Sequence, residues 1–193
     1  MVGSKARDAD GFKLWVSGCD RGKNGVGILV DRNLRELVVE VRRVNDRLMA
    51  IKLVVGGSTL NVISAYAPQV GLDEEIKRRF WEEFDGLVWS ILLTEKLFIG
   101  GEFNGHIGAT SWGYDGVHGS FGFGVRNGGG TALLDCAKAF DLVIANSCFP
   151  KKERSTWLHF GVRWPRLKLI IYSSRSAIGV CAWIARLYPA RIS

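Results

Sequence analysis

The chain has 193 residues, a length that corresponds to one domain. Hydrophobic residues make up 47% of it and charged residues 23%, so the composition is that of a folded globular protein and not of a disordered one. The longest nearly apolar run, 177–185, is too short to span a membrane, because a spanning helix needs roughly 20 apolar residues. The charged first residues predict no secretory signal, and four widely spaced cysteines indicate reduced thiols. We therefore expect an intracellular protein, in the nucleus or the cytoplasm.

The net charge of +7 is concentrated near the C-terminal end. Residues 1–150 carry 17 Lys and Arg against 18 Asp and Glu, whereas residues 151–193 carry 9 basic residues and a single acid, Glu153. A basic segment of this kind attracts polyanions, nucleic acid first among them. The same composition is equally compatible with a second interpretation, in which residues 151–193 belong less well to the fold than the rest of the chain.

The first half of the chain is predicted to form strands. Short runs rich in β-branched and aliphatic residues lie at 25–31, 37–41 and 48–55. A turn signal at 56–58 then joins the last of these runs to 59–66 as a hairpin. Both faces of 59–66 are partly apolar, which is typical of a strand that is covered on both sides.

Helices and strands alternate in the second half. Asp73 is a good N-cap, and apolar residues at spacings of three and four from there to Ile91 predict an amphipathic helix. Thr131 is expected to cap a second helix. Further strands are predicted at 96–101, 142–145, 155–157 and 167–172. Consecutive strands followed by this alternation favour an α/β fold of mixed sheets with helices outside.

The candidate site lies where the predicted strand 96–101 runs through two glycines into Glu102 and Asn104. In an extended chain these two side chains point the same way. A carboxylate beside an amide at a strand end suits a base or metal ligand next to a hydrogen-bonding group. An ordinary strand-end loop can present the same pair. The glycine-dense stretch that follows, up to Gly130, is typical of a functional or mobile loop.

The neighbouring residues extend this pattern into a family resemblance. Gly100 to Gly108 (Gly-Gly-Glu-Phe-Asn-Gly-His-Ile-Gly) resembles the Gly-Asp-Phe-Asn-x-His-x-Gly motif of the endonuclease/exonuclease/phosphatase superfamily. Ser64 to Pro68 (Ser-Ala-Tyr-Ala-Pro) is similar to the Tyr-x-Pro strand end of that family. Over residues 3–160 the chain resembles the endonuclease domains of RTE-type non-LTR retrotransposons and craniofacial-development-protein-like relatives.

The resemblance implies a four-layer α/β sandwich, two mixed β-sheets flanked by helices, truncated at both ends relative to the family. It divides the chain into a domain at 1–160 and a diverged basic segment at 161–193. The implied activity is hydrolysis of DNA phosphodiesters with Mg²⁺ or Mn²⁺. Position by position, Glu102 corresponds to the base that activates water, Asn104 to the amide that holds the phosphate, and Tyr66 to a contact with the phosphate or leaving group.

Several family positions differ in this chain. The metal-binding Glu of the family is expected ahead of Gly3, so the metal ligands of this chain stay unknown. Glu102 stands where the family has Asp, and the extra methylene shifts the carboxylate by about 1 Å. Lys168 stands where the family's Arg/Gln-Ile-Asp-Tyr strand has its Asp, which is expected to replace a carboxylate near the metal with a cation and so reverse the local charge. The sequence contains no Ser-Asp-His. His106 matches a histidine of this subgroup and is expected to organise the loop.

Two functional hypotheses result. The first is a metal-dependent DNA endonuclease domain of retrotransposon origin with impaired or lost activity. The second is a catalytically silent nucleic-acid-binding protein or transposon remnant, in which Trp157, Arg163 and Arg166 stack on bases and contact phosphates. Burial in the core is the alternative interpretation of Trp157. DNA is the expected partner, no membrane association is expected, and the oligomeric state is not predicted.

Overall fold

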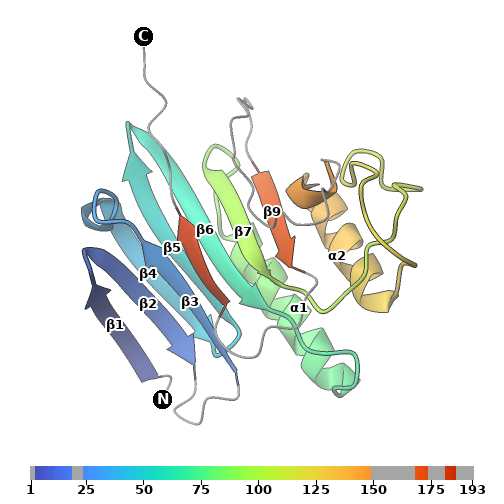
Figure 1. The fold of residues 1–193 in the computed structure, drawn as a ribbon, viewed down its shortest axis with the longest axis horizontal. Helices are drawn as coiled ribbons and strands as arrows, with labels where there is room; N and C mark the ends of the chain where they lie inside the picture. The colour runs from blue at the N-terminus through green and yellow to red at the C-terminus, as the bar shows by residue number, and fades with distance from the viewer. Residues whose placement is uncertain (1–2, 19–23, 149–167, 174–180, 186–193) are drawn as a thin grey trace.

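Within the described residues, the fold is built from two β-sheets and two α-helices (Figure 1). The computed structural model describes residues 3–18, 24–148, 168–173 and 181–185. The four-stranded sheet has the order β1-β2-β3-β10, with strands β1 (Gly3–Ala9), β2 (Phe12–Gly18), β3 (Gly25–Val30) and β10 (Cys181–Ala185). The six-stranded sheet has the order β4-β5-β6-β7-β9-β8, with strands β4 (Val38–Asn45), β5 (Leu48–Val55), β6 (Ser58–Tyr66), β7 (Lys96–Glu102), β8 (Val143–Ile144) and β9 (Lys168–Ser173). The helices are α1 (Glu74–Trp89) and α2 (Gly128–Ala139), with 3₁₀ turns at Arg35–Leu37 and Ala145–Ser147.

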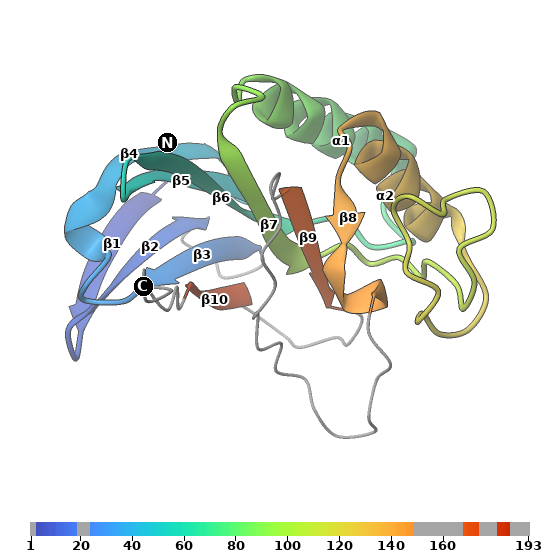
Figure 2. The same ribbon diagram turned by 90° about the horizontal axis from the view of Figure 1, so that it is seen from above.

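Two apolar layers hold these elements together (Figure 2). The layer between the two sheets contains Trp15, Val26, Ile28, Val30, Leu34, Met49, Ile51 and Leu53. The layer between the six-stranded sheet and the helices includes Leu48, Ile63, Leu97, Ile99, Phe80, Phe84, Leu133 and Leu134. Successive residues of one strand face opposite layers, as Leu48 and Met49 do. The six-stranded sheet is therefore buried on both faces, as its continuous apolar runs predict.

This architecture confirms the predicted α/β fold of two mixed sheets. Figure 2 shows α1 and α2 on the same side, over the six-stranded sheet. In the described part of the chain no helix covers the outer face of the four-stranded sheet, so three of the four expected layers are seen. Among the described residues, no helix is long and apolar enough to cross a membrane.

The order of connections brings two strand ends to one edge. Strands β4, β5 and β6 are antiparallel hairpin partners, and the hairpin predicted over 48–66 is confirmed. The chain then passes through α1 before it enters β7, and this crossover makes β6 and β7 parallel. Asp73 caps α1 as predicted, since its side chain accepts a hydrogen bond from the Glu75 N–H. The carboxyl ends of β6 and β7 consequently lie side by side.

The start of α2 and the first two strands differ from the sequence-based expectation. Asn127, and not Thr131, caps α2: its Oδ1 accepts the Gly130 N–H at 2.9 Å. Thr131 instead lies in the first turn and donates its hydroxyl to the Asn127 carbonyl at 3.2 Å. Three consecutive glycines conceal this start, because glycine is a poor helix former. Strands β1 and β2 were not predicted, because charged residues and glycine interrupt their apolar pattern.

The C-terminal part of the chain supplies a strand to each sheet. Strand β9 pairs in parallel with β7 and β8, and β10 pairs in parallel with β3. The boundary predicted at residue 160 lies outside the described residues and stays a prediction.

Aromatic side chains join α1 to the strand end of β7. Phe84 is fully buried, and its ring centroid lies 5.7 Å from that of Trp81 and 5.9 Å from that of Phe103. Phe103 is 1% exposed and immediately follows Glu102. The packing of α1 therefore determines where the chain leaves β7.

We expect Phe84→Ala to lower the free energy of unfolding by about 3–5 kcal/mol, because it removes a buried aromatic ring and leaves a cavity. Urea denaturation followed by tryptophan fluorescence measures this change. Leu93→Ala is the control, since Leu93 is 85% exposed; it should change stability by less than about 0.5 kcal/mol. Equal effects of the two substitutions would contradict the placement of Phe84.

A carboxyl and a thiol meet between the two helices. The Cys136 thiol donates to Asp85 Oδ1 at 3.8 Å. Burial raises the pKa of the Asp85 carboxyl, and the hydrogen bond from Cys136 only partly opposes this change. Burial also raises the pKa of the Cys136 thiol, and the nearby Asp85 carboxylate raises it further. The folded protein therefore disfavours the ionised form of the Asp85 carboxyl relative to the unfolded chain.

The raised pKa predicts that Asp85→Asn stabilises the protein at neutral pH. The ordinary pKa of this carboxyl is 3.8. Because the pKa is higher in the folded protein, the protein loses stability as the pH rises from 3.8 through the pKa of the folded state. The asparagine variant lacks this loss, so its advantage should vanish below about pH 4. Thermal melts across this range, with the exposed Asp141→Asn as control, measure the difference; an advantage that persists at low pH would contradict the assignment.

Candidate functional site

Tyr66 and Glu102 lie beside each other at the carboxyl edge of the six-stranded sheet. They are register partners in the parallel pairing of β6 and β7, so about 4.8 Å separates their backbones. The Ala67 N–H donates to the Glu102 carbonyl at 2.8 Å and extends the pairing beyond the strands. We call the residues Tyr66, Ala67, Glu102 and Asn104 the site edge.

The Glu102 side chain lies on the face of β7 that looks toward the four-stranded sheet. Leu97, Ile99 and Phe103 belong to the apolar layer under the helices, so Glu102 points to the opposite face. Tyr66 packs against the layer between the sheets, on the same face as Glu102. Glu102 is 8% exposed, and its Oε1 accepts the Asn104 N–H at 3.1 Å. The carboxylate is thereby held in place by its own loop.

Asn104 leaves the extended backbone conformation of β7 and reaches the chain that follows β6 with its side chain. Its φ of +49° lies in the left-handed region, where asparagine is better tolerated than most residues. Its Nδ2 donates to the Ala67 carbonyl at 2.7 Å. The expectation that Glu102 and Asn104 point the same way assumed an extended chain, and this condition is not met at Asn104. All three predicted site residues are nonetheless brought together.

Two glycines of the motif are required by close backbone contacts. A Cβ on Gly101 would lie 2.0 Å from the Ala65 carbonyl oxygen, and a Cβ on Gly105 would lie 2.4 Å from the Gly129 carbonyl carbon. Such distances are far below contact distance, so only glycine fits at these positions. Gly101 lets β6 and β7 approach at the site edge, and Gly105 seats the loop on the start of α2.

His106 and Asn127 fasten the loop that follows. The His106 side chain is exposed. Its backbone N–H donates to Asn127 Oδ1 at 2.9 Å, and its carbonyl accepts the Asn127 N–H at 3.1 Å. The Asn127 side chain thus caps α2 and holds the loop at once. Sequence reasoning missed Asn127, although an asparagine before a helix start is a recognisable cap signal.

A second histidine, His118, is buried inside the glycine-rich loop. Its Nδ1 accepts the Ser120 N–H at 2.9 Å, which leaves Nε2 to donate to the Gly108 carbonyl at 3.1 Å. Arg126 also donates to loop carbonyls, those of Ile107 at 3.3 Å and Trp112 at 3.1 Å. Neither residue is marked by a sequence pattern. They make this loop an ordered framework.

Lys168 does not lie beside Glu102. In the parallel pairing of β7 with β9, Lys168 is the partner of Leu97, whereas Ser173 is the partner of Glu102. At about 3.3 Å per residue, Lys168 is about 16 Å along the sheet from the level of Glu102. The prediction that Lys168 reverses the charge of the site is therefore wrong, because the strand register brings a different residue to the site edge.

The nucleic-acid-binding candidates Trp157, Arg163 and Arg166 lie outside the described residues. Their predicted contacts with bases and phosphates stay predictions.

The described residues contain no group of three or more His, Cys, Asp or Glu that could hold a metal ion. At the site edge Glu102 supplies a carboxylate, one oxygen of which accepts the Asn104 N–H. Mg²⁺ needs a nearly octahedral set of oxygen ligands. The described part of the chain does not form such a set by itself, and binding of Mg²⁺ or Mn²⁺ stays a prediction.

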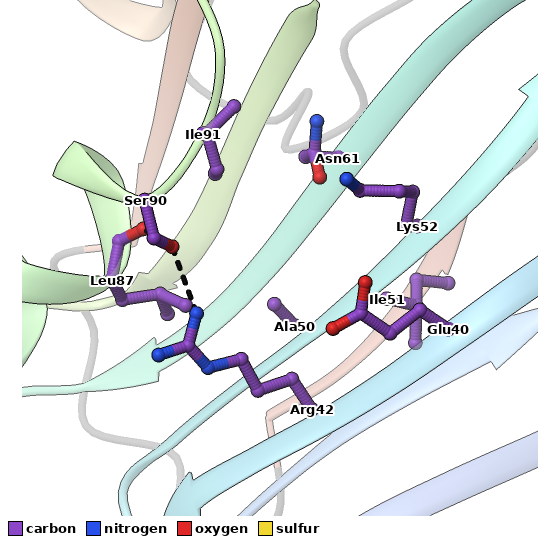
Figure 3. Close-up of a pocket in the computed structure, with 9 residues that line it drawn as sticks. All are labelled: Glu40, Arg42, Ala50, Ile51, Lys52, Asn61, Leu87, Ser90 and Ile91. Atoms are coloured by element: carbon purple, nitrogen blue, oxygen red, sulfur yellow. Dashed lines mark hydrogen bonds between the residues drawn. The ribbon is translucent and has the colours of Figure 1, made fainter.

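A pocket of about 80 Å³ opens at the other end of the sheet, under the end of α1 (Figure 3). Its lining residues are Glu40, Arg42, Ala50, Ile51, Lys52, Asn61, Leu87, Ser90 and Ile91. Arg42 Nη1 donates to Ser90 Oγ at 2.8 Å across it. Asn61 lies about 16 Å along β6 from Tyr66. This pocket is therefore separate from the site edge.

The chain that forms the site edge is similar in sequence to craniofacial development protein 2 from two organisms. It is 30% identical to the protein of Bos taurus over 137 residues, which cover 70% of this chain and 23% of that protein. The identity to the protein of Tragulus javanicus is also 30% over 137 residues, or 24% of that protein. The chain thus spans about a quarter of the length of these relatives.

This similarity confirms the expected resemblance to craniofacial-development-protein-like relatives. No family model matches the chain. No solved structure matches it either.

The close approach at Gly101 predicts that Gly101→Ala destabilises the protein by about 3 kcal/mol, because the new methyl group overlaps backbone that has no room to move. Gly86→Ala is the matched control: its Cβ would have no neighbour within 4 Å, and alanine in a helix should raise stability by about 0.5–1 kcal/mol. Chemical denaturation of both variants measures the difference. Unchanged stability of Gly101→Ala would show that β6 and β7 do not approach as described.

Proposed function

We propose that this chain is a domain of the endonuclease/exonuclease/phosphatase type, of retrotransposon origin, that binds DNA phosphates at the site edge. Its metal-dependent phosphodiesterase activity is impaired. The observation that carries the proposal is the meeting of Tyr66, Glu102 and Asn104, which come from the ends of two strands that are distant in sequence. These are the residues that the family resemblance assigns to the leaving-group contact, the base and the phosphate-holding amide.

The site edge suits the recognition of a phosphodiester by a combination of groups. A tyrosine hydroxyl and an asparagine amide can donate hydrogen bonds to phosphate oxygens, and a carboxylate can accept a proton from water. The three groups lie on one edge of the sheet, at the ends of β6 and β7. The cofactor in this proposal is Mg²⁺ or Mn²⁺, whose positive charge would offset that of the phosphate.

Two features support impaired cleavage. Glu102 replaces the family's shorter aspartate, and a displacement of 1 Å in a catalytic group can cost about 100-fold in rate. The Asn104 N–H also donates a hydrogen bond to one Glu102 oxygen, and this bond holds the carboxylate in its present position. Cleavage needs the base and the metal ligands together, so the loss of one group has a large effect.

A catalytically silent nucleic-acid-binding protein is the second candidate function. The observation that favours it is the excess of basic residues at 151–193. Basic residues contact phosphates without any catalytic group, and such binding weakens steeply as salt is added. The two candidates differ in one measurable respect, because only the first keeps residual cleavage that depends on Glu102.

We expect the purified chain to cleave plasmid and abasic duplex DNA weakly or not at all with Mg²⁺ or Mn²⁺. Glu102→Asp should raise the rate by about 10–100-fold, because it restores the family's carboxylate position. Glu102→Ala should abolish residual cleavage, and Glu82→Ala on the exposed face of α1 should not change it. A nicking assay with these four proteins makes the comparison.

Three outcomes would decide between the candidates. Strong wild-type cleavage that Glu102→Ala abolishes would show an unimpaired enzyme. DNA binding without cleavage in the wild type and in Glu102→Asp would favour the silent binder. Absence of both binding and cleavage would refute the proposed function.

A further inference from the structure

The outer edge of β4 forms one end of the six-stranded sheet (Figure 2). Among the described strands, none pairs with β4 on the side away from β5. Such an edge presents a row of backbone N–H and C=O groups with which a further strand can pair. Register shifts lie between Val38 and Glu40 and between Arg43 and Asn45, so the stretch 40–43 pairs regularly. This stretch is therefore the part of the edge that suits a further strand.

Two opposite charges lie on one face of this stretch. Glu40 and Arg42 are exposed, and Val41 between them packs against the layer between the sheets. The β5 partner of Arg42 is Ala50, which belongs to the layer under the helices. Glu40 and Arg42 therefore share the helix side of the sheet, where Figure 3 shows both at the pocket near the end of α1.

Neither charge is neutralised within the described part of the chain. No ion pair there includes Glu40 or Arg42. Lys52, the strand partner of Glu40, pairs with Glu95 at 3.3 Å instead. Arg42 donates to the Ser90 hydroxyl at 2.8 Å, and this neutral acceptor leaves its charge uncompensated. Charges of one sign on an edge strand repel a second copy, whereas opposite charges two residues apart do not.

The edge of β4 is complementary to itself in one antiparallel register. A two-fold axis at Val41 places Glu40 opposite Arg42 of a second copy, and symmetry repeats this contact. Val39, which is 61% exposed, then lies opposite Arg43, whose Nε donates to the Val16 carbonyl at 3.0 Å. The methylene groups of an arginine fixed in this way can cover an apolar neighbour. A slip of the register by two residues would oppose like charges, so the charges select a single pairing.

We propose that β4 is a homodimer interface, in which the edges of two copies pair antiparallel about Val41 and join two six-stranded sheets into one. The two Glu40–Arg42 contacts between the copies determine the register. One pair of short edges buries less than the roughly 1,200–2,000 Å² of a standard interface, so the dimer is weak and depends on protein concentration. This inference is independent of the proposed function, because the interface contains no residue of the site edge.

Charge reversal on the full chain tests the register. Glu40→Arg makes both edge charges positive and Arg42→Glu makes both negative, so each variant opposes like charges twice. We expect each to raise the dissociation constant of its own dimer at least about tenfold. An equimolar mixture of the two variants restores both attractive contacts and should associate about as strongly as the wild type. Glu82→Arg, a control with the same charge change on exposed α1, should dimerise normally. Sedimentation equilibrium at low salt measures each constant.

The mixture and the double variant keep the test independent of folding defects. Glu40→Arg combined with Arg42→Glu exchanges the two charges on every copy and should restore self-association. Added salt should weaken the wild-type dimer, because exposed ion pairs are screened. Thermal melts show whether each single variant is folded. A wild type that stays monomeric up to its solubility limit would overturn the inference, and so would folded single variants that dimerise like the wild type or fail to associate with each other.

Discussion

The backbone of Gly101 lies so close to the backbone of Ala65 that no side chain larger than hydrogen fits between them, and the site edge depends on this contact. The close approach lets the parallel pairing run to the very ends of β6 and β7, where Tyr66 and Glu102 become partners. The hydrogen bonds of Ala67 with Glu102 and Asn104 then hold the two chains together beyond the sheet. A site made from two loops would lack this fixed spacing.

Side chains along β7 alternate between a face that packs against the helices and a face that carries the candidate base Glu102. Leu97, Ile99 and Phe103 are buried against the helices, so the even-numbered Glu102 is turned to the opposite face. Phe103 connects the motif to the aromatic cluster of α1, and Gly105 connects it to the start of α2. The position of one carboxylate is thus determined by packing in a layer that the carboxylate does not touch.

Sequence patterns predict the strongly periodic parts of this fold and the residues of the site edge. The hairpin of β5 and β6, the capped helix α1 and the buried strand β7 have apolar spacing that only one structure satisfies. The start of α2, strands β1 and β2, and the bend at Asn104 escape prediction because they depend on contacts distant in sequence or on a glycine-rich backbone. A motif alignment does not specify strand register, and for this reason the sequence places Lys168 near Glu102 when it is the partner of Leu97.

The places of β9 and β10 in the two sheets affect how the chain folds while it is being synthesised. Strand β9 is inserted between β7 and β8, so the six-stranded sheet cannot become continuous until residue 173 has emerged. Cys181 pairs with Val26, which joins β10 to β3 across more than 150 residues of sequence. Pairings between such distant residues carry a large loop-closure entropy and slow the search for the native topology. A nascent chain that ends before β9 holds Glu102 on β7, whose edge away from β6 is still unpaired, and the sheet is completed only after β9 has been synthesised.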